Sequence, residues 1–341
     1  MAELQGTFDD RDGWIWFDGE LVPWRDARVH VLTHALHYAS SVFEGQRAYN
    51  GVIFKLHEHS ERLRRSAELL GFELPWTADE IDAACKEVLK ANGWTDAYMR
   101  PVAWRGSESM GVAPGKTKPH LAIAAWEWGK YFDPEIAKHG IRLDIAPWRR
   151  PAPYTAPTES KAAGLYMICT LSKQHAETRG FHDALMLDWR GRVAEATGAN
   201  VFFVQDGALH TPTPDCFLDG ITRQTVMDLA RRRGVDVVER AIWPEELENF
   251  QQMFLTGTAV EITPVQSAGP WNFEVGDLTR QLANFFYGFN AEFPCNHFFH
   301  HVRRFLHEID KSRDRLRTSG GKKIFIRAFF VLHHVQHDHG G

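Results

Sequence analysis

Residues 184–204 read A-L-M-L-D-W-R-G-R-V-A-E-A-T-G-A-N-V-F-F-V, and this stretch decides the fold of the second half of the chain. Its apolar residues predict a strand over 184–188, its glycine predicts a turn, and further strands are expected over 193–204. Glu195 interrupts the apolar run, where a buried carboxylate needs a cationic partner such as a protonated ring nitrogen. A glutamate in a strand is also compatible with a solvent-facing position or an ordinary ion pair.

The sequence around this stretch completes an α+β unit. A strand is predicted near Ile141, followed by a proline-rich loop. Helices are predicted over 163–179 and 222–233, because each apolar pattern is followed by a glycine. A strand over 252–255 then enters a turn over 256–259.

The first part of the chain predicts a second, smaller α+β unit. Its expected elements are a hairpin over 14–22, a helix over 57–70, a helix that opens with a capping box at 77–80, and strands over 97–105 and 120–128. We therefore expect a small domain over 1–128 and a large domain over 139–283, joined by a linker over 129–138 that contains Asp133-Pro134.

Residues 284–341 differ in character from the rest of the chain. Residues 291–341 contain 8 of the 18 histidines, without helical or strand periodicity. We interpret 284–341 as a foreign, frame-disrupted or disordered tail outside the packed core. Its histidines have no recognisable ligand spacing, so no metal site is expected.

Composition limits the classes of partner. The chain has 341 residues, 44% of them hydrophobic and 24% charged, with a formal net charge of −5. These values are typical of a globular protein and give no reason to expect a nucleic-acid or membrane partner. Four distant cysteines without a C-x-x-C pair, and a start without a signal peptide, predict a cytoplasmic protein with reduced thiols.

Three features of the second unit could form one site. Lys161 follows a proline-bounded loop and precedes a helix rich in small and apolar residues. Burial disfavours the ammonium form of a lysine, and the free amine can form a Schiff base with an aldehyde. Residues 220–223, G-I-T-R, begin a helix whose N–H groups suit a phosphate, and Glu195 suits a protonated ring nitrogen. Taken alone, such residues are more often a surface lysine, a helix cap and a strand glutamate that faces solvent or forms an ion pair.

Six sequence motifs, which follow one another along the chain, indicate a resemblance to a known family. The chain resembles the fold-type IV aminotransferases that use pyridoxal 5'-phosphate (PLP), and among them the branched-chain amino-acid aminotransferases. The resemblance runs from about residue 14 to 282. It rests on V-H-V-L-T-H-A-L-H-Y-A-S-S-V-F-E-G (29–45), A-Y-M-R-P (97–101), S-K-A-A-G-L-Y (160–166), E-A-T-G-A-N-V-F (195–202), D-G-I-T-R (219–223) and L-T-G-T-A-V-E-I-T-P-V (255–265).

The resemblance implies a fold and a cofactor site. The implied fold is a small α/β N-terminal domain followed by a larger domain with a β-barrel-like core flanked by helices. Lys161 matches the catalytic lysine that forms the Schiff base with PLP, Glu195 the partner of the pyridine nitrogen, and Tyr166 the partner of the phenolic oxygen. The implied phosphate contacts are Arg62, Ile221, Thr222 and Thr258.

The resemblance also implies a substrate pocket. Tyr98 and Arg100 lie on one face of a predicted strand, and Arg100 would meet the side-chain carboxylate of glutamate. The N–H groups of Thr258 and Ala259 would bind the α-carboxylate. Aromatic wall positions are matched by Tyr38, Phe43, Trp128 and Tyr131.

The implied activity is transamination of leucine, isoleucine and valine with 2-oxoglutarate, in a homodimer or higher homo-oligomer. One alternative is a D-amino-acid aminotransferase or an aminodeoxychorismate lyase of the same fold. An alternative of another class is a non-catalytic scaffold with a His-rich binding tail. The cofactor residues are all of the expected types, which favours the enzyme.

Overall fold

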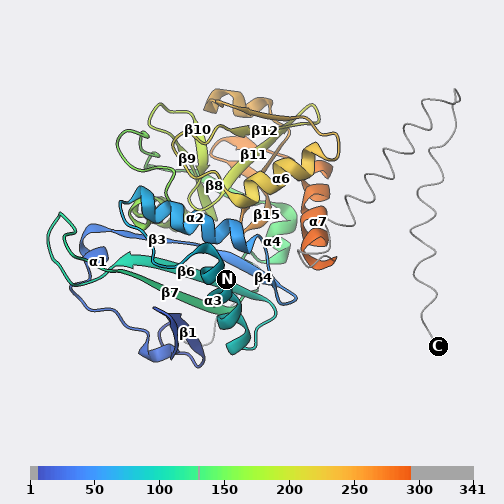
Figure 1. Cartoon of the computed structure of the whole chain (residues 1–341). Helices are drawn as coiled ribbons and strands as arrows, with labels where there is room; N and C mark the ends of the chain where they lie inside the picture. Colours follow the sequence, from blue (N-terminus) through green and yellow to red (C-terminus); the bar gives the residue numbers. More distant parts are fainter. Residues whose placement is uncertain (1–6, 130, 293–341) are drawn as a thin grey trace, which may run out of the picture. The chain divides into compact units, whose positions relative to one another are not determined.

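The computed structural model describes residues 7–129 and 131–292, which form two β-sheets with their helices (Figure 1). The described residues up to Glu292 belong to one compact unit. Strands and helices both contribute, so the α+β class predicted from the sequence is confirmed. The division into two domains at 129–138 stays a prediction, although each sheet lies wholly on one side of that segment.

The first sheet is antiparallel, and its strands run in the order β2-β1-β7-β6-β4-β5, with β3 paired to β6. The strands are β1 (Trp14–Phe17), β2 (Glu20–Pro23), β3 (Ser41–Phe43), β4 (Gln46–Tyr49), β5 (Val52–Ile53), β6 (Ala97–Arg105) and β7 (Pro119–Glu127). Its helices are η1 (Trp24–Asp26), α1 (His34–Tyr38), α2 (Leu56–Leu69) and α3 (Ala78–Ala91).

Local sequence explains the ends of these elements. The predicted capping box starts α3, because the Thr77 hydroxyl accepts from the Glu80 N–H and the Glu80 carboxylate accepts from the Thr77 N–H. Gly71, which follows the C-cap residue Leu70 of α2, adopts a positive φ of 75°, as is common where a helix stops. Apolar residues of α2 and α3, such as Leu63 and Ile81, pack on the sheet as its core.

The second sheet is mixed, and its strands run in the order β10-β9-β8-β15-β14-β11-β12-β13, with β16 paired to β15. The strands are β8 (Ile141–Ile145), β9 (Asp183–Leu187), β10 (Val193–Ala196), β11 (Asn200–Gln205), β12 (Ala208–Pro212), β13 (Val237–Arg240), β14 (Gln252–Gly257), β15 (Glu261–Ala268) and β16 (Trp271–Asn272). The helices of this part are α4 (Pro134–His139), η2 (Ala163–Tyr166), α5 (Met167–Thr178), α6 (Ile221–Arg231), η3 (Pro244–Asn249) and α7 (Asp277–Glu292).

This sheet must curl. Strands β10 and β11 are five positions apart in the strand order, yet only residues 197–199 connect them. Five strand spacings in a flat sheet span about 24 Å, whereas the four Cα–Cα steps from Ala196 to Asn200 reach at most about 15 Å. The curl agrees with the barrel-like core implied by the resemblance, and it brings the 197–199 connection to the end of the sheet where the cavity lies.

Three elements differ from the sequence prediction. Part of the expected linker forms the short helix α4, and the helix expected over 163–179 begins with the 3₁₀ turn η2. The expected tail begins too early, because residues 284–292 continue α7. Phe286 is 2% exposed and its ring packs edge-on against Phe54, with centroids 5.6 Å apart. The remainder of the predicted tail, residues 293–341, lies outside the described residues.

Among the described residues, no helix combines the length and the apolar character that crossing a membrane would require.

Candidate functional site

A cavity of about 260 Å³ lies between the two sheets. This volume is near the lower end of the range for small-molecule sites, roughly 300 Å³. Four of its lining residues are cationic, Arg62, Arg100, Arg150 and Lys161, and one is acidic, Glu195. The excess of cations suits a ligand that carries several negative charges.

Lys161 reaches this cavity from the loop before η2, and its backbone is fixed on two sides. Its N–H donates to the Ser66 hydroxyl of α2 at 3.0 Å, and its carbonyl accepts from the Phe43 N–H at 3.2 Å. The neighbouring Ser160 hydroxyl donates to the Ser66 carbonyl at 2.9 Å. The first and second sheets are therefore joined at the lysine, which holds its side chain in one place.

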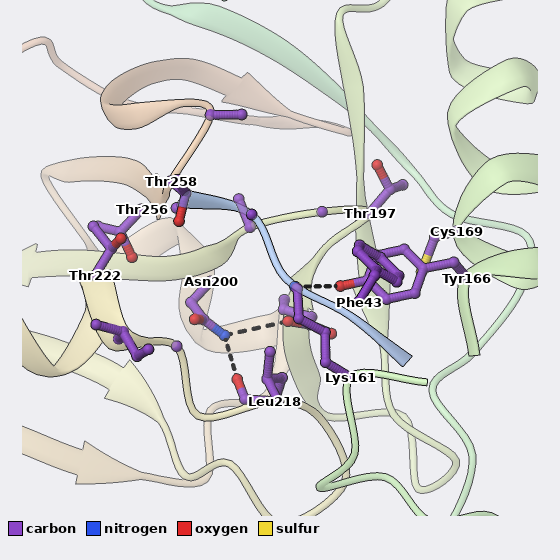
Figure 2. A pocket seen from close by; sticks show the side chains of 18 of the residues that line it. Phe43, Lys161, Tyr166, Cys169, Thr197, Asn200, Leu218, Thr222, Thr256 and Thr258 are labelled. Carbon is purple, nitrogen blue, oxygen red and sulfur yellow. Dashed lines mark hydrogen bonds between the residues drawn. The ribbon is translucent and has the colours of Figure 1, made fainter. Parts of the chain in front are cut away.

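The Lys161 amine meets Tyr166 inside the cavity. Its Nζ donates to the Tyr166 hydroxyl at 2.8 Å, and Figure 2 shows the two side chains joined by this bond. The turn η2 separates the two residues by five positions and folds the tyrosine back over the lysine. Phe43 packs against Tyr166, with ring centroids 4.7 Å apart, and shields one side of the amine.

Glu195 is a buried carboxylate on β10. The Arg150 Nε lies 3.3 Å from its Oε1, and the Asn200 side-chain amide donates to its Oε2 at 3.2 Å. Burial raises the pKa of Glu195 to about 7, although Arg150 and Lys161 act in the opposite direction. A carboxylate with such a pKa can share a proton with a ring nitrogen near neutral pH.

The start of α6 and the nearby Arg62 form an anion-binding end of the cavity. Ile221 and Thr222 are the first residues of α6, where backbone N–H groups have no partner within the helix. A Cβ on Gly220 would lie 2.2 Å from the Asn200 Oδ1, so this close approach requires glycine. Figure 2 places Thr222 and Thr258 on the same side of the cavity.

Another part of the cavity wall is aromatic and contains a second anion-binding group, Arg100. Arg100 donates to the Tyr98 hydroxyl at 3.0 Å and lies 4.7 Å from the centre of the Phe43 ring. Trp128 packs on Tyr98, with centroids 4.8 Å apart, and Tyr131 packs on Trp128. An apolar wall around one arginine can accept an aliphatic chain and, in turn, a carboxylate.

The structure brings all but one of the sequence-predicted residues to this cavity. Its lining includes Arg62, Lys161, Tyr166, Glu195, Ile221, Thr222, Thr258, Phe43, Tyr98, Arg100, Trp128, Tyr131 and Ala259. Tyr38 does not line the cavity formed by this chain, and its role in the substrate pocket stays a prediction. Its ring packs on His34 at the end of α1, and a left-handed Ala39 turns the chain before β3 begins.

Sequence reasoning missed two residues that hold Glu195. Asn200 lies in the quoted motif 195–202, and its side chain also donates to the Leu218 carbonyl at 3.0 Å before α6. It therefore links the carboxylate to the segment before α6, and Figure 2 marks its bond to Leu218 with a dashed line. Arg150 stands beside Arg149 in a W-R-R-P run, and nothing in that run distinguishes the buried arginine from the exposed one.

These residues fit PLP on observations of this structure. The Arg62 Nη1 and the Thr256 hydroxyl are buried polar atoms without a hydrogen-bond partner, and both residues line the cavity. Unpartnered buried donors are costly, so they indicate a ligand with acceptors at that end. The amine of Lys161 suits an aldehyde, and Glu195 suits a ring nitrogen.

Comparisons with known proteins agree with this geometry. A profile of the amino-transferase class IV family matches residues 41–268. The branched-chain-amino-acid aminotransferase of Pseudomonas aeruginosa is 42% identical over 261 residues, which cover 75% of this chain and 85% of that protein. A crystal structure of the Escherichia coli branched-chain amino acid aminotransferase superposes with a TM-score of 0.80 and 38% identity, covering 84% of this chain and 98% of that one.

A second solved structure was determined in its PLP form. It is the holo-form of the branched-chain amino acid aminotransferase from Thermobaculum terrenum, which has a TM-score of 0.75 and 30% identity. It covers 82% of this chain and 94% of its own. Since the family profile spans more than half of the sequence and solved relatives share the fold, the chain belongs to the class IV amino-transferase family.

Proposed function

We propose that this chain transfers the amino group of leucine, isoleucine and valine to 2-oxoglutarate, giving the branched 2-oxo acids and L-glutamate. The cofactor is PLP. The observation that carries the proposal is the meeting of Lys161, Tyr166 and Glu195 in a single cavity with an excess of cationic side chains. The activity named for the curated relatives supports the choice of branched-chain substrates.

PLP, when bound, supplies an electron sink for the negative charge that remains on the substrate α-carbon after its proton is removed. In the proposed assignment, Lys161 holds the cofactor and then acts as the general base at the α-carbon. A positioned general base contributes about 10²–10⁴-fold to a rate. The backbone bonds of Lys161 to Ser66 and Phe43 keep the amine near the reacting carbon.

Glu195 and Tyr166 have different roles in the proposed site: one concerns the proton on the cofactor ring, and the other concerns the orientation of the Lys161 amine. The Glu195 carboxylate would keep a proton on the pyridine nitrogen, and Arg150 beside it favours the charged carboxylate. The Tyr166 hydroxyl, already bonded to the Lys161 amine, orients that amine.

Two kinds of substrate must use one pocket in this reaction. Trp128 and Tyr131 offer an apolar surface to a branched side chain, while Arg100 offers a charged partner to the side-chain carboxylate of glutamate. The Arg100 Nε is buried without a partner, which supports a role in binding an anion that enters with the substrate. The α-carboxylate would bind to the N–H groups of Thr258 and Ala259.

We also propose that the chain assembles as a homodimer or a higher homo-oligomer. Val31, Leu36 and Val112 are 70%, 63% and 82% exposed. The His34 ring nitrogen lies 2.9 Å from the Gly111 carbonyl oxygen, so these apolar side chains belong to neighbouring segments. Apolar surface of this kind is typical of subunit interfaces.

We propose a cytoplasmic location as well. Cys85, Cys169 and Cys216 are buried and unpaired, as expected of a protein that folds in a reducing compartment.

The proposal is tested with the purified protein, PLP, L-leucine and 2-oxoglutarate. We expect glutamate and the branched 2-oxo acid to form in equal amounts, and D-alanine to be inactive as the donor. Activity with D-alanine instead of L-leucine would favour the D-amino-acid alternative. Release of pyruvate from a lyase substrate without any acceptor keto acid would favour the lyase.

A further inference from the structure

Glu44, between β3 and β4, is a fully buried carboxylate that the proposed reaction does not use. It binds Arg62 of α2 side-on: Oε1 accepts from the Arg62 Nε at 2.7 Å, and Oε2 accepts from Nη2 at 2.8 Å. Oε2 also accepts from the His59 Nδ1 at 2.7 Å, one turn earlier on α2. A buried carboxylate with three such contacts is held in one position.

The charges of Glu44 and Arg62 cancel, so this cluster is neutral without a proton charge on His59. Burial would raise the pKa of Glu44, but Arg62 and His59 outweigh it and hold that pKa well below its usual range. Burial lowers the pKa of His59, against the pull of Glu44, so the ring is neutral and carries its proton on Nδ1. Glu44 and Arg62 therefore form a neutral pair, and His59 adds a neutral donor.

The pair leaves one part of the guanidinium free. Nε and Nη2 of Arg62 are taken by Glu44, whereas Nη1 is buried and has no partner. Arg62 lines the cavity together with Thr222 and Thr258. An arginine side chain loses rotamer entropy when it is fixed, and Glu44 fixes Arg62 before any ligand arrives.

We propose that Glu44 is a positioning residue for cofactor binding: it holds the Arg62 guanidinium so that Nη1 faces the phosphate of PLP. This inference rests on the proposed phosphate contact of Arg62. Glu44 touches neither the cofactor nor the substrate, and it acts through Arg62 alone. His59 supports it by saturating the outer side of the carboxylate.

The test compares two ligands that differ only in the phosphate, PLP and pyridoxal. Each is titrated into the cofactor-free protein, and quenching of tryptophan fluorescence reports binding because Trp126 and Trp128 line the cavity. In Glu44→Gln, we expect the Kd of PLP to rise about 10- to 100-fold, as for the loss of one charged hydrogen bond. The Kd of pyridoxal should stay within about twofold, because its affinity does not depend on Arg62.

Four further variants make the result decisive. Arg62→Met should show the same selective loss, and the double variant Glu44→Gln/Arg62→Met should bind PLP no more weakly than Arg62→Met alone. Leu63→Val perturbs the same helix without touching the pair, so it should not separate PLP from pyridoxal. If Glu44→Gln does not fold, Glu44→Asp, which keeps the charge but withdraws the carboxylate, should give a smaller selective loss.

Equal weakening of PLP and pyridoxal by both Glu44 variants would overturn the inference and assign Glu44 a purely structural role. So would losses that add in the double variant. If instead Arg62→Met fails to distinguish the two ligands, the proposed phosphate contact of Arg62 is wrong, and the inference falls with it. If Arg62→Met distinguishes them and Glu44→Gln does not, only the inference about Glu44 fails.

Discussion

Replacing Glu195 by glutamine should change how the stability of the cofactor-free protein depends on pH. Burial raises the pKa of this carboxyl from 4.5 to about 7 in the folded state. The folded protein therefore holds the proton more tightly than the unfolded chain, and stability falls as pH rises between these two values. A pKa difference of about 2.5 corresponds to about 3 kcal/mol, all of which is lost above pH 7.

Urea unfolding of the cofactor-free wild type and of Glu195→Gln at pH 5, 6, 7 and 8 measures this effect. Glutamine resembles the protonated acid, so at pH 5, just above the unfolded-state pKa, the two proteins should differ in stability by less than about 1 kcal/mol. At pH 8 the variant should be more stable by about 3 kcal/mol. Glu20→Gln, at the exposed start of β2, is the matched control for the loss of one carboxylate and should follow the wild type.

Parallel stability curves for wild type and Glu195→Gln across this pH range would refute the reasoning. They would mean that Arg150, whose Nε lies 3.3 Å from the carboxylate, outweighs burial and keeps Glu195 ionised at all these pH values.

Three other changes test the site. Tyr166→Phe removes the hydroxyl that the catalytic amine donates to at 2.8 Å, so kcat should fall about 10- to 100-fold; an unchanged kcat would contradict this. Arg100→Met should raise the KM of glutamate at least about tenfold and that of leucine far less, and equal changes in steady-state kinetics would argue against the shared pocket. Glu261 adopts a positive φ of 52° and accepts from the Tyr49 hydroxyl at 2.6 Å. Glu261→Gly should raise the KM of both substrates by loosening the turn at 258–259, whereas Asn50→Gly, at a φ of 49°, should not; equal KM values in the two variants would refute that role.

The elements that the sequence predicted well are those with short-range signals. Thr77 and Glu80 satisfy each other's backbone groups within one turn, and Gly71 stops α2 through its own backbone freedom. The order of strands in the second sheet has no such signal, because β8 pairs with β9 and β15, which lie far along the chain. The end of α7 was missed because its Phe-rich composition obscured the apolar face on which Phe286 packs.

In the candidate site, too, the residues in sequence motifs could be predicted, whereas those placed by tertiary packing could not. Lys161, Tyr166 and Glu195 stand in motifs whose residue types the chemistry dictates. Arg150 could not be singled out, since its burial depends on the packing of η2 and α5 and not on its neighbours in sequence. Tyr38 was assigned to the pocket by its position in a motif. That assignment stays a prediction, because its ring packs on His34 and does not line the cavity of this chain.

The most direct test of the proposed function is the visible absorbance spectrum of the PLP-loaded protein, recorded before and after L-leucine is added without a keto acid. The absorbance band of the cofactor should disappear with L-leucine and persist with D-alanine, and the Lys161→Ala variant should show no such change. A band that L-leucine leaves unaltered, or transamination that survives in Lys161→Ala, would contradict the account.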